Sequence, residues 1–318
     1  MSRYLVTGAA GFIGSHVCDA LLDRGDTVVG VDNFDAAYPR AVKEHNVAGL
    51  RGRPGFELIE ADLTGDPLPI GRVAAVVHLA ARAGVRASLE DPAAYVRANV
   101  GGTARVLDLA RTTGVERVVL GSSSSVYGLA PLPFVEDAPA APRSPYAATK
   151  RAAELLAEAY ARVYGLRVAM PRLFSVYGPR QRPDLAIYQF TERIAQGRAI
   201  TVFGDGSSER DYTYIKDGVA GIVAALDWTA RAPAGECSAI NIGGGEPVRL
   251  DRVIALVARA VGREAVIERL PEHPGEVRAT AADLCRARRE LGYCPRVGIE
   301  EGIEVFVRWY EARHGRQS

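Results

Sequence analysis

The chain has 318 residues, of which 48% are hydrophobic and 24% charged, and its 39 basic side chains nearly balance its 38 acidic ones. A chain of this length can form one compact α/β unit with an elaborated C-terminal part. The formal net charge of +1 argues against a polyelectrolyte partner, so we expect no nucleic acid ligand.

Short apolar strands alternate with amphipathic helices in the first part of the chain. We expect strands at residues 4–7, 27–32, 56–61, 74–80, 117–122 and 166–173. We expect helices at residues 13–24, 93–113 and 146–164. This alternation is typical of a doubly wound parallel sheet, so we predict a Rossmann-type α/β fold.

The pattern changes after about Phe174, where Gly, Pro and charged loops interrupt shorter elements. We expect helices near residues 186–196, 248–261 and 299–312 and a strand at 199–203. We therefore predict a first domain over residues 1–174 and a smaller α/β domain over residues 175–318 that folds over the strand ends. These boundaries allow for segments of one range that fold as part of the other domain.

Targeting, metal and disulfide signals are lacking in the sequence. No signal-peptide pattern follows Met1, and no apolar run approaches the length of a membrane span. The cysteines have neither CxxC spacing nor a histidine cluster beside them. They are Cys18, Cys237, Cys285 and Cys294. We therefore expect a cytoplasmic protein with no membrane contact, no metal site and no disulfide framework.

A glycine-rich turn joins the first expected strand to the first expected helix. In TGAAGFIG, residues 7–14, the glycines at 8, 11 and 14 permit a sharp turn, close approach to a pyrophosphate and packing on the sheet. The glycines alone also fit an ordinary turn, but Asp32 ends the next strand 18 residues after Gly14, where a carboxylate accepts from ribose hydroxyls. Because Asp32 repels a 2′-phosphate, we predict NAD rather than NADP.

Tyr146 and Lys150 are four residues apart on an expected helix and therefore share one face. The strand that ends in GSSSSVYG, residues 121–128, brings hydroxyl groups to the same edge of the sheet. A phenol has a pKa of about 10, but an adjacent ammonium and a positive nicotinamide favour the phenolate. Tyr146 can then take a proton from a sugar hydroxyl as hydride leaves, while Lys150 holds the nicotinamide ribose. The pair by itself also occurs by chance on many helices.

Several segments together resemble one protein family. They are TGAAGFIG at residues 7–14, HLAARAG at 78–84, SSSSVYG at 122–128, YAATK at 146–150, GDGSSERDYTYIKD at 204–217 and GEVRATAAD at 275–283. The chain resembles, from end to end, the extended short-chain dehydrogenase/reductase family and, within it, the nucleotide-sugar 4-epimerases. The resemblance implies that Ser123, Tyr146 and Lys150 are catalytic, that the first domain binds NAD and that the second mainly binds a UDP-sugar. It also implies a homodimer packed through the helices at 93–113 and 146–164.

The predicted cofactor contacts gather at the strand ends and on the catalytic helix. They are Gly8, Gly11, Phe12, Ile13, Gly14, Asp32, Asn33, Asp62, Leu63, Leu79, Ala80, Ala81, Asn99, Tyr146 and Lys150. Asp62 and Leu63 either border the adenine or cap the end of the third strand.

The predicted substrate contacts come from both parts of the chain. They are Arg86, Ser123, Ser124, Ser125, Tyr146, Ser175, Arg182, Gln189, Val202, Arg210, Glu276 and Arg278. The resemblance implies that Arg210, Glu276 and Arg278 hold the diphosphate and the uridine ribose. A lone arginine is more often a solvated surface charge, and many relatives have Arg where His273 stands, so the duties of Arg86 and Arg278 stay open.

Ser124 and Ser125 distinguish between reaction types. Related sugar-nucleotide dehydratases carry an Asp-Glu pair in this segment, and related decarboxylases tend to carry a Glu there. A hydroxyl with an ordinary pKa can bind a sugar but cannot easily drive an elimination. Oxidation followed by return of the hydride needs only Tyr146, Ser123 and NAD, provided that the keto intermediate turns over in the pocket.

The segment RPDLA, residues 182–186, resembles the RPDMA of epimerases that act on UDP-glucuronic acid, and glucose-type 4-epimerases commonly have Asn at the position of Ser175. Arg182 can form a fork with the sugar carboxylate, and Ser175 can add a hydrogen bond. Alternatively, Arg182 caps its own loop through Asp184. A clamp matters because a 4-keto-uronic acid is a β-keto acid, which loses carbon dioxide when the bond to its carboxylate aligns with the carbonyl.

The sequence thus predicts an NAD-dependent isomerase that inverts C4 of UDP-glucuronate, through a 4-keto intermediate, to give UDP-galacturonate. The alternative substrate is UDP-glucose or UDP-N-acetylglucosamine. Ser125 argues against a UDP-glucuronate decarboxylase. The intact Ser123, Tyr146 and Lys150 argue against a non-catalytic sensor that only binds NAD.

Overall fold

The computed structural model describes residues 1–65, 68–271 and 277–315. Within these ranges, eight strands form one parallel sheet in the order β12-β7-β5-β4-β1-β2-β3, with β6 beside β7. They are β1 (Arg3–Thr7), β2 (Thr27–Asp32), β3 (Phe56–Glu60), β4 (Ala75–His78), β5 (Arg117–Leu120), β6 (Ser122–Ser123), β7 (Arg167–Leu173) and β12 (Cys237–Ile242). The strand order reverses between β1 and β4, so the predicted doubly wound α/β fold is confirmed.

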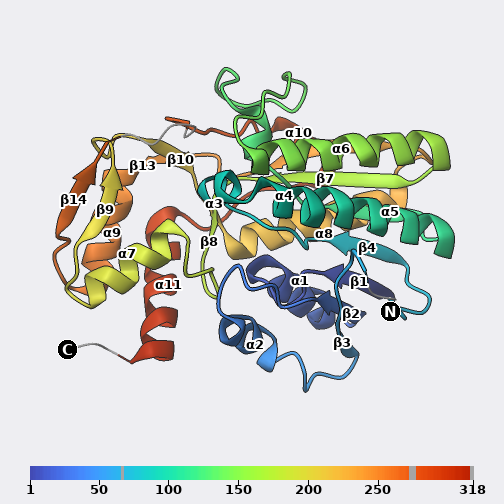
Figure 1. The fold of residues 1–318 in the computed structure, drawn as a ribbon, viewed down its shortest axis with the longest axis horizontal. Helices are drawn as coiled ribbons and strands as arrows, with labels where there is room; N and C mark the ends of the chain where they lie inside the picture. The colour runs from blue at the N-terminus through green and yellow to red at the C-terminus, as the bar shows by residue number, and fades with distance from the viewer. Residues whose placement is uncertain (66–67, 272–276, 316–318) are drawn as a thin grey trace.

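Helices cover both faces of this sheet (Figure 1). On one face, α1 (Phe12–Asp23) and α8 (Ile215–Arg231) pack against residues such as Val6 and Val28. On the other face, α5 (Gly102–Thr113) and α6 (Pro145–Tyr164) pack against their strand neighbours, such as Leu5 and Val29. Because successive strand residues point to opposite faces, apolar runs such as Tyr4 to Val6 supply both layers of the core.

A smaller lobe lies to one side of the sheet, at the left of Figure 1. It contains β9 (Ile200–Phe203) paired in parallel with β14 (Ile267–Leu270), and the helices α7 (Ala186–Ala195), α9 (Leu250–Val261) and α11 (Ile299–His314). The remaining elements are α2 (Arg40–Ala48), α3 (Val85–Glu90), α4 (Pro92–Tyr95), η1 (Val96–Gly101), η2 (Ser124–Tyr127), β8 (Val176–Tyr177), β10 (Glu209–Asp211), β11 (Thr213–Tyr214), β13 (Pro247–Arg249) and α10 (Cys285–Leu291). No helix in the described ranges combines the length and apolarity needed to cross a bilayer.

The structure differs from the expected elements in several places, such as α2, which no pattern predicted. The helix expected at 93–113 is three pieces, because a π-helical turn, η1, separates α4 from α5. This wider turn ends at Gly101 and carries Asn99 into the interior. Sequence patterns did not predict α8 or β12, which return to the large sheet after the break at Phe174. β12 pairs with β7. Gly221 of α8 packs so closely on Ile242 of β12 that a Cβ on Gly221 would lie 2.8 Å from the Ile242 side chain.

Candidate active site

A cavity of about 650 Å³ opens at the carboxyl ends of the sheet strands. It brings most of the predicted cofactor and catalytic residues together with four further predicted substrate contacts, Ser124, Ser125, Ser175 and Arg182. These lining residues are Gly8, Gly11, Phe12, Ile13, Gly14, Asp32, Asn33, Asp62, Leu63, Leu79, Ala80, Ala81, Ser123, Ser124, Ser125, Tyr146, Lys150, Ser175 and Arg182. The cavity lies where the strand order reverses, which is where open α/β sheets bind their ligands.

The glycine turn between β1 and α1 needs its glycines for steric reasons. Gly8 has φ of +72°, and a Cβ on it would lie 2.8 Å from Ala80 N. A Cβ on Gly14 would lie 2.0 Å from Gly8 O, so no side chain fits there. Gly11 brings no side chain to cap α1, which begins at Phe12, so backbone N–H groups of the first helical turn remain for a ligand.

Asp32 is held at the end of β2 by three donors. Its carboxylate accepts from Ala10 N at 3.1 Å, from Phe34 N at 2.8 Å and from the Lys43 ammonium at 3.3 Å. Lys43 comes from α2 and also lines the cavity; sequence reasoning missed it because no pattern predicted that helix. Asp32 is therefore a fixed negative group with a cation beside it.

The ends of β2 and β3 are tied together by two predicted residues. Asn33 Nδ2 donates to Asp62 Oδ2 at 2.8 Å, and Asp62 Oδ1 accepts from Thr64 N at 2.8 Å and from its hydroxyl at 2.5 Å. The Thr64 bonds, first that of its side chain, lower the pKa of Asp62. Asp62 thus caps its strand and lines the cavity at once, so the two readings of this residue are compatible.

Asn99, a predicted cofactor contact, is buried and is not among the described residues that line the cavity. Its Oδ1 accepts from Arg82 N at 2.8 Å, and its Nδ2 donates to Arg82 O at 3.0 Å and to Thr149 Oγ1 at 2.9 Å. The Thr149 hydroxyl in turn donates to Tyr146 O at 2.8 Å. Asn99 therefore links the loop after β4 to the helix that carries Tyr146.

The predicted catalytic side chains converge from two elements. Ser144 caps α6 by accepting from Ala147 N at 3.1 Å, and this fixes the first turn, which carries Tyr146. One turn later, Lys150 Nζ donates to Gly121 O at 2.8 Å. Ser123 comes from β6 and hydrogen-bonds the Tyr146 phenol.

The electrostatics of these groups follow from burial. Burial raises the pKa of Tyr146, and the Ser123 hydrogen bond and the positive charge of Arg182 act in the opposite direction. Burial lowers the pKa of Lys150 to about 8, against the attraction of Glu154. Arg182 is thus a cation that acts on the phenol, a role that sequence reasoning gave to Lys150 and the positive nicotinamide.

A buried ion pair between Glu154 and Arg172 holds β6, the strand that carries Ser122 and Ser123, in place. Ser122 Oγ donates to Glu154 Oε1 at 2.6 Å, and Arg172 donates to both Glu154 oxygens at 2.9 Å. Burial alone would raise the pKa of Glu154, but the bonds and charge of Arg172, together with the bonds from Ser122 and Arg151, outweigh it and lower the pKa. Sequence reasoning missed this pair, although Glu154 lies one helical turn after Lys150.

Arg182 lines the cavity but already has partners. Its Nε and Nη2 donate to Asp184 at 3.0 and 2.7 Å, and Nη2 also donates to Ala83 O at 3.1 Å. The loop contact with Asp184 that the sequence left open is therefore present, while 15% of the Arg182 side chain remains exposed. Ser175 lines the same region with φ of 21°, an uncommon backbone conformation for serine.

The other predicted substrate residues do not line this cavity, within the part of the chain that the structure describes. Arg86 lies over the Phe203 ring, with Cζ 3.9 Å from its centroid. Arg210 Nη1 donates to Arg278 O at 3.2 Å, so these two predicted anchors are neighbours. Val202 is buried in β9, and Gln189 lies on the exposed face of α7. Glu276 and His273 fall outside the described residues.

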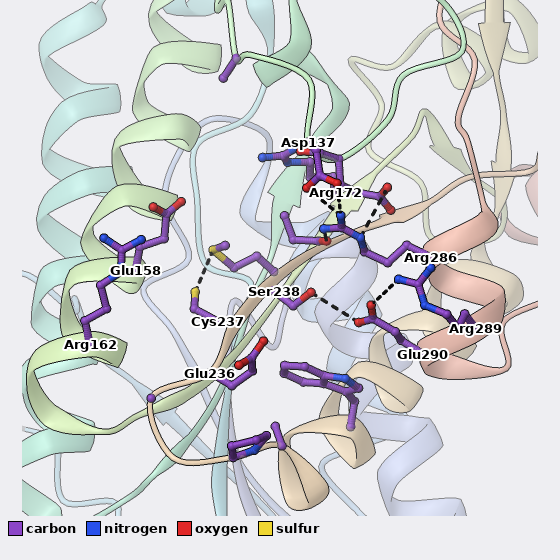
Figure 2. Close-up of a pocket in the computed structure, with 18 of the residues that line it drawn as sticks. Asp137, Glu158, Arg162, Arg172, Glu236, Cys237, Ser238, Arg286, Arg289 and Glu290 are labelled. Atoms are coloured by element: carbon purple, nitrogen blue, oxygen red, sulfur yellow. Dashed lines mark hydrogen bonds and ion pairs between the residues drawn. The ribbon is translucent and has the colours of Figure 1, made fainter.

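A larger cavity, of about 1070 Å³, lies elsewhere, between α6, α8, α10 and the edge strand β12 (Figure 2). Its charged side chains are largely matched within the cavity: Arg286 donates to Asp137 at 2.7 Å, for example, and Arg289 to Glu290 at 2.9 Å. Among the described residues that line it, none is a predicted site residue. Nor do the described residues contain a group of three His, Cys, Asp or Glu side chains arranged for a metal. Size alone therefore does not identify the candidate site.

Comparison with known proteins agrees with this geometry. The model of the NAD dependent epimerase/dehydratase family matches residues 4–243. A UDP-glucuronate 4-epimerase of Thermodesulfobacterium geofontis is 42% identical over 97% of this chain and 96% of its own length. A probable UDP-glucuronate 4-epimerase of Rhizobium meliloti is 40% identical over 99% and 98%, respectively.

Solved structures agree as well. A Bacillus cereus UDP-glucuronic acid 4-epimerase, crystallised with UDP-glucuronic acid and NAD, superposes with a TM-score of 0.94 at 36% identity, over 98% of this chain and all of that one. The resemblance inferred from the sequence motifs is thereby confirmed. The chain belongs to the NAD dependent epimerase/dehydratase family.

Proposed function

We propose that this protein is an NAD-dependent isomerase that inverts C4 of UDP-glucuronate, through a 4-keto intermediate, to give UDP-galacturonate. One observation carries the proposal: a single cavity is lined by the glycine turn and Asp32, by Ser123, Tyr146 and Lys150, and by Arg182. The activity named for the Thermodesulfobacterium geofontis relative and the ligands of the Bacillus cereus structure support the same reaction.

The part of the cavity formed by residues 1–174 fits NAD. The open N-terminus of α1 suits a pyrophosphate, and the Asp32 carboxylate suits ribose hydroxyls but repels a 2′-phosphate. When bound there, NAD would supply the acceptor for the hydride from C4 of the sugar and the donor for its return. Residues 175–318 serve mainly to hold the nucleotide sugar, with Arg210 and Arg278 as neighbouring anchors for its phosphates.

Tyr146 is the group that takes the proton from the C4 hydroxyl and gives it back. Burial raises its pKa on balance, and its hydrogen bond with Ser123 and the charge of Arg182 act against that rise. The positive nicotinamide of bound NAD would shift the balance further toward the phenolate. Ser123 aligns the phenol with the sugar hydroxyl. The Lys150 ammonium, fixed on Gly121 O, orients the nicotinamide ribose.

The serines after the catalytic strand limit the chemistry to epimerisation. Ser125 donates to Ser123 Oγ from its backbone N at 3.2 Å and from its hydroxyl at 2.9 Å. Ser124 and Ser125 supply hydroxyls where elimination would need an acid and a base. A keto intermediate held here keeps its substituents until the hydride returns.

Arg182 is the candidate carboxylate clamp, and its contacts also favour a second substrate. An arginine that is 15% exposed can still receive a sugar carboxylate through its remaining donors. However, Asp184 already occupies Nε and Nη2, as expected if Arg182 only shapes its loop. This observation favours UDP-glucose or UDP-N-acetylglucosamine as the second candidate.

We also propose that the protein is a cytoplasmic homodimer. The outer faces of α6 and of the neighbouring π-helical turn expose apolar side chains. Leu155, Val163 and Tyr164 are 51%, 69% and 51% exposed, and Val96 is 52% exposed. Packing α5 and α6 against a second copy would cover these residues. The free thiols of the four cysteines suit a reducing compartment.

A panel of UDP-sugars tests the proposed function. The protein is incubated with UDP-glucuronate, UDP-glucose and UDP-N-acetylglucosamine without added NAD, and the products are resolved by chromatography. We expect UDP-galacturonate from the acid and much slower conversion of the neutral sugars. Faster conversion of a neutral sugar would move the second candidate to first place, and a UDP-pentose as the main product would contradict epimerisation.

A further inference from the structure

Three loops that are far apart in the sequence meet at the wall of the candidate NAD cavity. The first, residues 33–38, joins β2 to α2; the second, residues 80–84, joins β4 to α3; the third, residues 178–185, joins β8 to α7. Each contributes to the cavity that the glycine turn and Asp32 also line. The loops therefore surround the space proposed for the cofactor.

An ion pair joins the first loop to the second. Arg82 donates to Asp35 Oδ2 from Nε at 3.2 Å and from Nη2 at 2.8 Å. Partial burial would raise the pKa of Asp35, but the bonds from Arg82 and from Ala37 N outweigh it and lower the pKa. Both partners are therefore charged at neutral pH. Their side chains are 30% and 28% exposed, so salt can still screen the attraction.

Arg82 and Asp35 are each held in place by contacts other than their ion pair. Asn99 holds Arg82 by its backbone N and O, at 2.8 and 3.0 Å. Asp35 Oδ1 accepts from Ala37 N at 2.9 Å, which fixes the carboxylate on its own turn. Because little freedom is left to lose, this pair is expected to hold better than an ordinary exposed pair.

The third loop contacts the other two. Arg182 Nη2 donates to Ala83 O of the second loop at 3.1 Å. The same guanidinium lies over the ring of Tyr38 in the first loop, with Cζ 5.3 Å from its centroid. Each loop thus contacts both others, and the contacts form a closed ring of three.

We propose that these loops form a clasp that keeps NAD bound through the whole catalytic cycle, with the Asp35–Arg82 pair as the contact that opens to release it. The inference rests on the proposed function, since an enzyme that must return its own hydride fails whenever the reduced cofactor leaves early. Asp35 and Arg82 are positioning residues in this account. They set how long the cofactor stays, and Tyr146 and Lys150 carry the chemistry.

The test measures release of radiolabelled NAD from the preloaded full-length protein after a chase with unlabelled NAD, at low and high salt. The variants are Arg82→Gln, Asp35→Asn and the double variant. The matched control is Arg3→Gln, which breaks an exposed ion pair with Glu57 (2.8 Å). Arg3 is the first residue of β1 and therefore lies at the opposite end of that strand from the glycine turn. Thermal unfolding of each variant checks the fold.

We expect each single variant to release NAD about three- to tenfold faster than wild type and the control, and the double variant to be no faster than the faster single variant. Salt should speed release from wild type and much less from the variants. Release unchanged in both single variants, or effects that multiply in the double variant, would overturn the clasp. Faster release from Arg82→Gln alone would overturn it too, because Arg82 would then contact the cofactor directly. A wild-type protein that takes up no NAD would overturn the proposed function and the clasp together.

Discussion

We call the part of the cavity formed by the glycine turn and Asp32 the cofactor wall, and the part formed by Ser175 and Arg182 the sugar wall. The cofactor wall is held by backbone contacts, whereas the sugar wall is held by side chains on loops. Gly14 packs so closely on Gly8 O that a Cβ would be 2.0 Å away, and the Asp32 carboxylate is bound by two backbone N–H groups. On the sugar wall, Arg182 depends on Asp184 and on a carbonyl from another loop. The glycines of the first wall tolerate little change, whereas substitutions on the second wall can change the substrate. Arg182 also joins the loops of the proposed clasp, so its loss should speed NAD release as well.

The strongest test of this contrast is Tyr146→Phe, at the junction of the two walls. It removes the proton-accepting oxygen and keeps the ring, so turnover should fall by about 100-fold or more. Thermal stability and NAD content should stay close to wild type, because neither wall is altered. Steady-state kinetics and cofactor extraction measure these quantities. Near-native turnover would assign the base to another group.

Arg182→Ala tests the sugar wall, because it removes the candidate partner of the sugar carboxylate. We expect kcat/KM for UDP-glucuronate to fall by roughly 30-fold, about 2 kcal/mol, with a much smaller change for UDP-glucose, since only the acid offers a carboxylate. Some turnovers should also end as a UDP-pentose with loss of carbon dioxide. The matched control is Arg180→Ala in the same loop, whose guanidinium is paired with Asp19 at 2.7 Å. Equal losses on both sugars would show that Arg182 supports the loop and does not bind the carboxylate.

Lys150, on the catalytic helix beside the cofactor wall, should make the free energy of unfolding depend on pH. Its pKa is lowered to about 8 by burial, against about 10.4 in an unfolded chain. Between these values the unfolded state binds more protons than the folded state, so the free energy of unfolding should rise with pH, by about 1 kcal/mol from pH 8 to pH 9. Urea denaturation of the NAD-free protein measures this rise. Lys150→Met should lack it, and the same slope in both proteins would contradict the lowered pKa.

Ser175→Ala is the mildest change. It removes one hydrogen-bond donor from the sugar wall, so we expect only a few-fold loss of kcat/KM for UDP-glucuronate, about 1 kcal/mol or less, and no change in NAD content. Competition between UDP-glucuronate and UDP-glucose in one reaction resolves so small a difference. A loss as large as that of Arg182→Ala would mean that the unusual backbone at Ser175 positions the whole wall.

The sequence was sufficient for the glycine turn, Asp32 and the Tyr-Lys pair because the requirements of these features are local. Glycines at fixed offsets, a carboxylate at the end of the next strand and a Tyr-Lys pair one helical turn apart each follow from backbone geometry. The doubly wound sheet follows from the alternation of strands and helices in the same way.

The remainder depends on contacts between distant segments. Lys43 reaches Asp32 from a helix that no pattern predicted, and Asn99 turns inward only because a π-helical turn interrupts the expected helix. The split of predicted substrate residues between the cavity and the β9–β10 region likewise follows from how loops pack, which short sequence patterns do not encode. The charge of Arg182, which opposes the rise that burial causes in the pKa of Tyr146, is of the same kind.

We expect one cavity to oxidise C4 and to return the same hydride. UDP-glucuronate deuterated at C4 tests this expectation directly, when converted without added NAD and analysed by mass spectrometry and NMR. The expected product is UDP-galacturonate that keeps its deuterium at C4. Loss of the label to solvent, or a stoichiometric need for added NAD, would contradict it.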